Sequence, residues 1–347
     1  MKYIHKAYIL TFLVLVASIF TLKAQEKKEI DILFIGNSFT ARHDLSELVK
    51  QVFEEGKPNL TVNVEKVIYG GQSLFQHHEY YYSQTFIEQN TIQDETIQNR
   101  IAEMQNLLEL NELPDEFVDF WQDIRKKKAR DFPKNLIEIA IKRHDALLNK
   151  KVRRKWDYVV LQSWMDEIPD LNDGYAKYAR KMSRIAKEEG AEVILYITAP
   201  DIQNKESVSS PINQENVDQE ISFVIDLAKE LKPYAVVHVP LAINMIQQGG
   251  TDLTFCYIND FHPNQRTAFL TANMFYAAFF KECTERFRFN TVTETKTHTN
   301  DQNPEAKLDP DGNPATVVFE KEEKNYLQSM AYKAAVKFVQ QWKKQSN

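Results

Sequence analysis

The chain alternates between short runs of consecutive apolar residues and longer stretches in which apolar residues recur at helical spacing. The apolar runs are rich in Val, Ile, Leu and Phe and end at glycine or polar residues, which is typical of strands buried on both faces. Five strands are predicted, at residues 30–35, 60–68, 157–162, 192–198 and 234–239. Helices are predicted at residues 46–53, 174–189, 214–231, 264–283 and 321–343. This order predicts an α/β fold with a doubly wound five-stranded parallel sheet.

Two segments interrupt the alternation. Residues 75–155 lie between the second and third strands and are too long for a simple crossover connection. Their apolar spacing predicts a helical insertion, with helices at residues 93–113 and 133–148. Residues 288–316 are rich in Thr, Asn and Asp and are expected to form a polar surface excursion. We expect both to belong to one domain that spans residues 25–347.

The first 24 residues have the pattern of a secretory signal peptide. Lys2 and Lys6 precede an apolar run over residues 7–20, and Ala24 offers a small side chain at a cleavage point. The run is shorter than the ~20 residues that span a bilayer. We therefore expect a periplasmic or secreted protein without a stable membrane anchor. Export would permit a disulfide between Cys256 and Cys283, but Cys283 ends an apolar helical run and two thiols are expected.

Charge narrows the range of partners. The chain has 43 Lys and Arg against 49 Asp and Glu, a formal net charge of −6. This balance argues against a general nucleic-acid binder, which needs a surplus of positive charge. Residues 125–155 differ from the rest, because they hold 13 Lys or Arg and only three acidic residues. That run is interpreted as a solvated helical face, or as a surface that steers an anionic polymer such as an acidic polysaccharide.

Candidate chemistry follows the predicted strands, where ligands bind in parallel sheets. Ser38 follows the first strand, Gly71 the second and Gln162 the third, and His262 with the nearby Asp260 comes late in the chain. Each also has a structural interpretation: Ser38 as a helix cap, the glycine as part of a turn, His262 as a packing or capping residue. Together they offer a nucleophile, a base with an acid, and oxyanion donors, so their joint occurrence favours catalysis.

These residues lie in four segments that resemble the SGNH (GDSL-type) hydrolases, in the exported subgroup with GNSFT in place of GDS. The segments are FIGNSFT at 34–40, GGQSL at 70–74, WDYVVLQ at 156–162 and FHPN at 261–264, in the order of that family. The resemblance implies a flavodoxin-like α/β/α fold and serine esterase chemistry without metal or cofactor. It makes Ser38 the nucleophile and His262 the general base, and it places the N–H groups of Ser38 and Gly71 in the oxyanion hole.

The chain departs from the family pattern at two points. The family's acid lies three residues before the histidine, where this chain has Asn259, and Asp260 is only two before. Asp260 is preferred as the acid, but Asn259 could instead orient a neutral imidazole, or Ser38 and His262 could act as a dyad. The third segment also lacks the Gly-x-Asn-Asp of the family. Gln162 is assigned as the third oxyanion donor, with Asp166 as the alternative.

Two further features are candidates for a supporting role and not for catalysis or metal binding. His77 and His78 follow the Gly-Gly loop and are candidates for lining the pocket, without enough ligands nearby for a metal. Residues 309–313 are similar to a calcium loop, but their glycine is in the fourth place instead of the sixth, so a polar turn is predicted.

The expected function is an exported serine esterase, in particular a carbohydrate O-deacetylase, with a small-molecule or polysaccharide ester as substrate. A lipid or thioester hydrolase is the alternative enzyme. A carbohydrate-binding protein that keeps the fold without turnover is the alternative of a different class.

Overall fold

The computed structural model describes residues 28–110, 134–150, 153–163, 170–198, 214–260 and 262–346. The predicted signal peptide, Asp166 and residues 125–133 and 151–152 of the basic run lie outside these ranges. In the described part of that run, Arg154 forms ion pairs with Asp31 at 2.5 Å and Glu65 at 3.0 Å. At least one of its charges therefore stabilises the contact between the insertion and the sheet.

A five-stranded parallel sheet forms the centre of the molecule, as the sequence predicted. Its strands are β1 (Lys28–Gly36), β2 (Leu60–Ile68), β3 (Tyr158–Gln162), β4 (Glu192–Ile197) and β5 (Ala235–His238). The order β2-β1-β3-β4-β5 is that of flavodoxin-like folds. In these folds the direction in which successive strands are added to the sheet reverses between β1 and β3, although all strands are parallel. Gly36 pairs with Ile68, and Ile35 with Leu161, so the carboxyl ends of these three strands lie level. The loops that follow them therefore meet at one edge.

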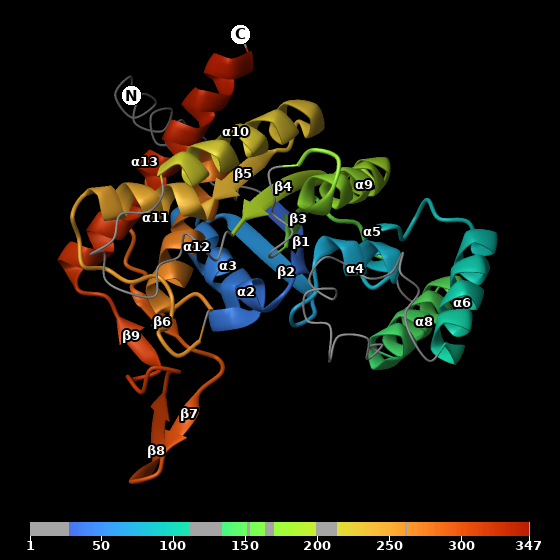
Figure 1. Cartoon of the computed structure of the whole chain (residues 1–347), viewed down its shortest axis with the longest axis horizontal. Coiled ribbons are helices and arrows are strands. Elements are labelled where there is room, and N and C mark those ends of the chain that lie inside the picture. Colours follow the sequence, from blue (N-terminus) through green and yellow to red (C-terminus); the bar gives the residue numbers. More distant parts are fainter. Residues whose placement is uncertain are drawn as a thin grey trace, which may run out of the picture.

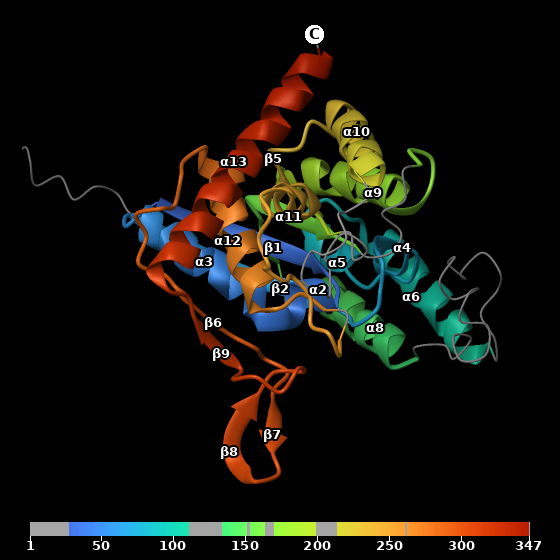
Figure 2. The ribbon, with the colours of Figure 1, turned by 60° about the vertical axis from the view of Figure 1, so that its left-hand side comes forward.

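Helices cover both faces of the sheet (Figures 1 and 2). On one face α3 and α12 pack against each other, and α9 covers the opposite face beside α4 and α5. The long α13 packs along α12 and reaches α10 and α11 near β5. The bounds are α3 (Leu45–Gly56), α4 (Leu74–Glu79), α5 (Gln84–Ile87), α9 (Gly174–Glu188), α10 (Gln214–Leu231), α11 (Val239–Gln248), α12 (Gln265–Phe280) and α13 (Lys321–Ser346). None of the helices in the described ranges is long and apolar enough to cross a membrane.

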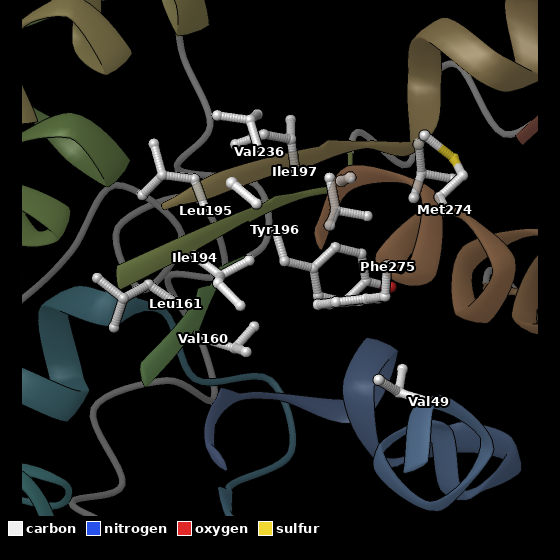
Figure 3. Packing of buried hydrophobic residues seen from close by; sticks show 14 of the residues in the cluster. Val49, Val160, Leu161, Ile194, Leu195, Tyr196, Ile197, Val236, Met274 and Phe275 are labelled. Carbon is white, nitrogen blue, oxygen red and sulfur yellow. The ribbon is translucent and has the colours of Figure 1, made fainter. Parts of the chain in front are cut away.

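The main core lies between the sheet and these helices. Figure 3 shows side chains of β3, β4 and β5 close to α12, where the rings of Phe275 and Tyr196 meet edge to face with their centroids 5.3 Å apart. Phe275 also lies 5.7 Å from Phe34 of β1. Because both faces are covered, the strands β3, β4 and β5 bury nearly every residue, which explains their uninterrupted apolar sequence. The edge strand β2 leaves most of its residues partly exposed.

The insertion between β2 and β3 forms a helix pair beside the sheet (Figure 1). Its helices α6 (Asp94–Glu109) and α8 (Lys134–Leu148) confirm the helical prediction over the described residues. They share a second, smaller core in which Met104 and Ile137 are fully buried together with Tyr80.

The polar excursion contains four short strands that the sequence pattern did not predict. β6 (Thr291–Thr293) pairs antiparallel with β9 (Thr316–Val318), and β7 (His298–Asn300) pairs antiparallel with β8 (Asn303–Leu308). The β7–β8 hairpin projects from the body (Figure 2). Its residues are mostly polar and exposed, so they show no alternation. The prediction of a surface excursion is wrong at its base, where Glu294 is fully buried.

Candidate active site

The chain turns sharply where β1 ends. An added Cβ at Gly36 would lie 2.3 Å from Gln162 Oε1 and 2.8 Å from Thr40 Oγ1, so the turn requires glycine. Asn37 then caps the short helix α2 (Ser38–Ala41), because its Oδ1 accepts from the N–H of Phe39 at 3.1 Å. Ser38 is therefore not the helix cap, and its hydroxyl is available for another partner.

That partner is His262. Its Nε2 lies 2.8 Å from Ser38 Oγ, although the two residues are 224 positions apart in the chain. On the other side of the ring, His262 Nδ1 donates to Asp260 Oδ1. With the proton held on Nδ1, Nε2 is free to accept the serine proton. The structure thus brings Ser38, His262 and Asp260 together in one line of hydrogen bonds.

The turn over residues 257–262 explains why Asp260 reaches the histidine from only two positions away. The N–H of Tyr257 donates to the His262 carbonyl at 3.2 Å, which closes the turn. Asp260 Oδ1 also accepts from the N–H of His262 at 3.3 Å, in an Asx-type turn. Asn259 is exposed, and its N–H donates to Asp311 Oδ1 at 2.8 Å. Asp260, and not Asn259, is the residue that contacts the imidazole.

Asp260 is held in its charged form. Burial alone would raise the pKa of this carboxyl, but hydrogen bonds from His262 and the nearby charge of Arg42 bring the pKa below its ordinary value. A charged Asp260 can stabilise an imidazolium when His262 accepts a proton.

Behind Asp260 lies a cluster of charged residues that the sequence analysis did not single out. Arg42 donates to Asp260 Oδ2, and its Nη1 lies 2.9 Å from Glu294 Oε2. His43 Nε2 lies 2.8 Å from the Pro263 carbonyl and 3.5 Å from Glu294. The only signal in the sequence is that Arg42 and His43 follow the GNSFT segment after one intervening residue, Ala41.

The predicted oxyanion donors Ser38 and Gly71 lie in the turns that follow β1 and β2. Ser38 begins α2, and Gly71 has φ +70° in the loop after β2, a conformation that favours glycine. Asn37 Nδ2 donates to the Gln72 carbonyl at 3.0 Å and so ties this loop to the nucleophile turn. Within the described ranges, the N–H groups of Ser38 and Gly71 have no acceptor.

Gln162 is not placed as the third oxyanion donor. Its side chain is fully buried, and Oε1 accepts from Asn37 N–H at 2.9 Å and from the Thr40 hydroxyl at 2.8 Å. Its amide group points away from the nucleophile, donating to the Ser163 carbonyl and to Thr198 Oγ1. Gln162 instead fixes the shape of the nucleophile turn. The alternative, Asp166, lies outside the described residues.

The two histidines after the Gly-Gly loop also differ from the expectation. His77 is fully buried and donates to the Gly36 carbonyl at 2.9 Å, and burial lowers its pKa to about 4. It is therefore neutral and supports the end of β1 instead of lining a pocket. His78 lies 3.2 Å from Glu79. Among the described residues, no cluster of His, Cys, Asp or Glu has the arrangement of a metal site.

Residues 309–313 form the polar turn that was predicted. Asp309 Oδ1 accepts from the N–H groups of Asp311 at 3.0 Å and Asn313 at 2.8 Å. The turn has a structural role at the site, since Asp311 accepts from the backbone N–H groups of Ile258 and Asn259. Cys256 and Cys283 are both thiols, as expected.

Comparison with known proteins gives structural likeness only. No protein-family model and no curated protein matches the chain. A protein from Slackia heliotrinireducens, described as a candidate SGNH hydrolase, is 15% identical, with a TM-score of 0.38 over 73% of this chain and 100% of its own. A DUF4886 family protein from Bacteroides uniformis is 13% identical, with a TM-score of 0.43 over 89% and 95%. A gut microbial diltiazem-metabolizing enzyme is 11% identical, with a TM-score of 0.35 over 73% of this chain and 47% of its own.

At such identities the activity has to be argued from the residues of this chain. The fold and the site define an α/β protein with a Ser–His–Asp arrangement at the carboxyl ends of a parallel sheet. This arrangement is the one that serine hydrolases of several unrelated folds use.

Proposed function

We propose that the protein is a serine hydrolase that cleaves carboxylic esters through an acyl-enzyme on Ser38. The observation that supports this best is the line of hydrogen bonds from Ser38 Oγ to His262 Nε2, at 2.8 Å, and from His262 Nδ1 to Asp260. A serine hydroxyl is a weak nucleophile unless an adjacent base accepts its proton.

In the first half of the reaction, Ser38 Oγ attacks the ester carbonyl while His262 takes the hydroxyl proton. The N–H groups of Ser38 and Gly71 stabilise the oxyanion of the tetrahedral intermediate. The intermediate then expels the alcohol, which receives the proton from His262. In the second half, His262 removes a proton from water, and the hydroxide attacks the acyl-enzyme. The second tetrahedral intermediate then expels Ser38 Oγ, which receives the proton from His262, and the acid is released.

The substrate that we propose is an acetylated carbohydrate outside the cytoplasm. Support comes from the resemblance to exported SGNH hydrolases and from the signal-like N-terminus. The site also reaches solvent, because the side chains of His262 and Asp260 are 24% and 19% exposed. A partly exposed triad is compatible with an acyl group carried on a larger molecule.

The test compares residues 25–347 with the Ser38→Ala variant on p-nitrophenyl acetate, butyrate and octanoate. We expect turnover of the short acyl group, loss of turnover in Ser38→Ala, and a fluorophosphonate adduct on Ser38 by mass spectrometry. A preference for octanoate would favour a lipid substrate. The absence of both turnover and adduct in a folded protein would contradict the hydrolase and favour a carbohydrate-binding role.

A further inference from the structure

The carboxylate of Asp260 divides its two oxygens between two partners. Oδ1 accepts from His262, and Oδ2 accepts from Arg42 Nη2. Asp260 lies only two residues before His262, so a single short turn holds its carboxylate beside the imidazole. Rotation of the Asp260 side chain would break its contact with His262 Nδ1. The bond to Arg42 opposes that rotation, because it fixes the second oxygen.

Arg42 is in turn fixed from behind. It is 5% exposed, and a charge buried to this extent needs compensation. Glu294, 0% exposed, provides it from the base of the excursion at 2.9 Å. Burial alone would raise the pKa of Glu294, but the neighbouring His43, the hydrogen bond from Lys296 N–H, the nearby Tyr257 hydroxyl and the charge of Arg42 lower it, so Glu294 is ionised. The three charges alternate in a row: Asp260 negative, Arg42 positive, Glu294 negative.

The backbone beside Arg42 adopts a costly conformation to reach this position. His43 and Asp44 have φ values of +59° and +53°, a left-handed conformation that side chains other than glycine seldom adopt. The kink directs His43 inward, where its ring lies against Tyr257 at 6.1 Å and donates to the carbonyl of Pro263. The same kink therefore fastens the loop on both sides of His262.

We propose that Arg42, anchored by Glu294, is a positioning residue that holds Asp260 against His262 and makes the two-residue spacing workable. This inference rests on the proposed function, because it assigns Arg42 a role in the same site. The three charges sum to −1 while His262 is neutral. They are balanced when His262 becomes an imidazolium, the form that precedes each proton transfer to a leaving group.

The test uses Arg42→Gln, Arg42→Lys, Glu294→Gln and the double variant Arg42→Gln/Glu294→Gln. We expect Arg42→Gln to lower kcat by about 10–100-fold with KM within about twofold, because a small displacement of a catalytic group can cost about 10²-fold in rate. Arg42→Lys keeps the charge and should recover much of kcat. Glu294→Gln should lower kcat less, and the double variant should be no worse than Arg42→Gln, because both changes remove the same restraint.

A pH profile separates positioning from a structural effect. The groups that face His262 and Asp260 are Arg42 and His43 from the segment after α2, Tyr257 from the same loop, and Glu294 from the excursion. Loss of the Arg42 cation leaves more negative charge beside the imidazole, which favours its protonated and inactive form. The acid limb of kcat/KM should therefore move to higher pH in Arg42→Gln and stay near that of the parent protein in Arg42→Lys.

A readout that needs no substrate separates this inference from the proposed function. In protein labelled with ¹⁵N-histidine, the Nδ1–H proton of His262 should give a downfield resonance that disappears in Asp260→Asn and weakens in Arg42→Gln. If the parent protein shows this resonance but hydrolyses no ester, the hydrolase proposal fails while the positioning role stands.

The matched control is Arg100→Gln, which removes an ion pair with Glu88 on the helical insertion, both side chains being 15% exposed. It should lower stability without changing kcat, the pH profile or the resonance. The proposal is overturned if folded Arg42→Gln keeps the parent kcat and resonance. If Arg42→Gln does not fold, unchanged kcat and resonance in both Arg42→Lys and Glu294→Gln overturn it equally.

Discussion

The two segments that interrupt the sheet pattern differ in what they bury. The helix pair α6 and α8 buries apolar side chains, such as Met104 and Ile137, in a small core of its own. The excursion over residues 288–316 buries charge at the main site, where Glu294 contacts Arg42 and Asp311 holds the loop before Asp260. The longer segment is thus largely self-supporting, and the shorter, more polar one is part of the candidate active site.

The difference shows which of the two segments holds the candidate catalytic residues in place. The helix pair can be added beside the sheet because α6 and α8 bury their apolar side chains in a core that they share. The excursion has no core of its own. Val292 and Phe289 pack on the main core, and hydrogen bonds and charges join the excursion to the turn after α2 and to the acid loop. Substitutions in the helix pair should therefore lower stability without changing turnover, and substitutions in the excursion should lower turnover with little change in stability.

The largest effect is expected at the acid itself, on the loop that the excursion holds. Asp260→Asn should lower kcat by about 10³–10⁴-fold, because an amide in place of the carboxylate favours the wrong histidine tautomer, as in serine proteases. Asn259→Asp, next to it on the exposed side of the turn, should remain within about fivefold of the parent protein. Rates on p-nitrophenyl acetate would measure both. The assignment of the acid is wrong if Asn259→Asp raises kcat and Asp260→Asn leaves it unchanged.

The helix pair should give the opposite signature. Ile137→Ala removes a fully buried side chain from the second core and should lower the free energy of unfolding by about 2–5 kcal/mol. Ile139→Ala on the same helix, where the side chain is 45% exposed, should change it by less than about 0.5 kcal/mol. Urea denaturation would measure both, and kcat of the folded protein should be unchanged in each. A loss of kcat in Ile137→Ala would mean that the insertion supports the site as well.

The same contrast explains what the sequence could predict. The sheet strands and the helices α3, α6, α8, α9, α10, α12 and α13 follow from apolar spacing, since each buries a face or a stripe in a core. Strand β2 and helix α10 have the predicted bounds. The strands of the excursion were missed because they are short and mostly exposed. Helix α11 was missed because it begins directly after β5, without an intervening polar turn.

For the site, the sequence indicated which residues are catalytic candidates but not the contacts that their neighbours make. Ser38, Gly71, Asp260 and His262 lie where strand ends and motif segments indicate, and the structure brings the triad together. Glu294 could not be found, because nothing in an isolated Glu within a polar segment indicates that it will be buried against Arg42. Gln162 was assigned to the oxyanion hole from its position after β3, but the direction of its side chain depends on contacts with Asn37 and Thr40 that spacing does not encode.

A smaller effect is expected where the excursion meets the acid loop. Asp311→Asn weakens two hydrogen bonds, to the N–H groups of Ile258 and Asn259 at 2.9 and 2.8 Å. The loop should become less well fixed, and kcat should fall by about tenfold with little change in the melting temperature. Asp301→Asn, at the exposed turn between β7 and β8, is the matched control and should behave like the parent protein. Equal rates in the two variants would mean that the excursion does not support the loop through Asp311.

The smallest effect concerns pH and stability, and it tests whether the excursion carries a buried charge into the site. The pKa of Glu294 is lowered in the folded protein, so the folded state holds its proton less tightly than the unfolded state does. The resulting stability is present above the unfolded pKa, near 4.5, and is lost as pH falls through the lower folded value. The free energy of unfolding should therefore fall less steeply below pH 4.5 in Glu294→Gln than in the parent protein. Glu305→Gln, on the exposed β8, should leave the slope unchanged. If the free energy of unfolding changes with pH at the same slope in all three proteins, Glu294 is not the ionised group that pairs with Arg42.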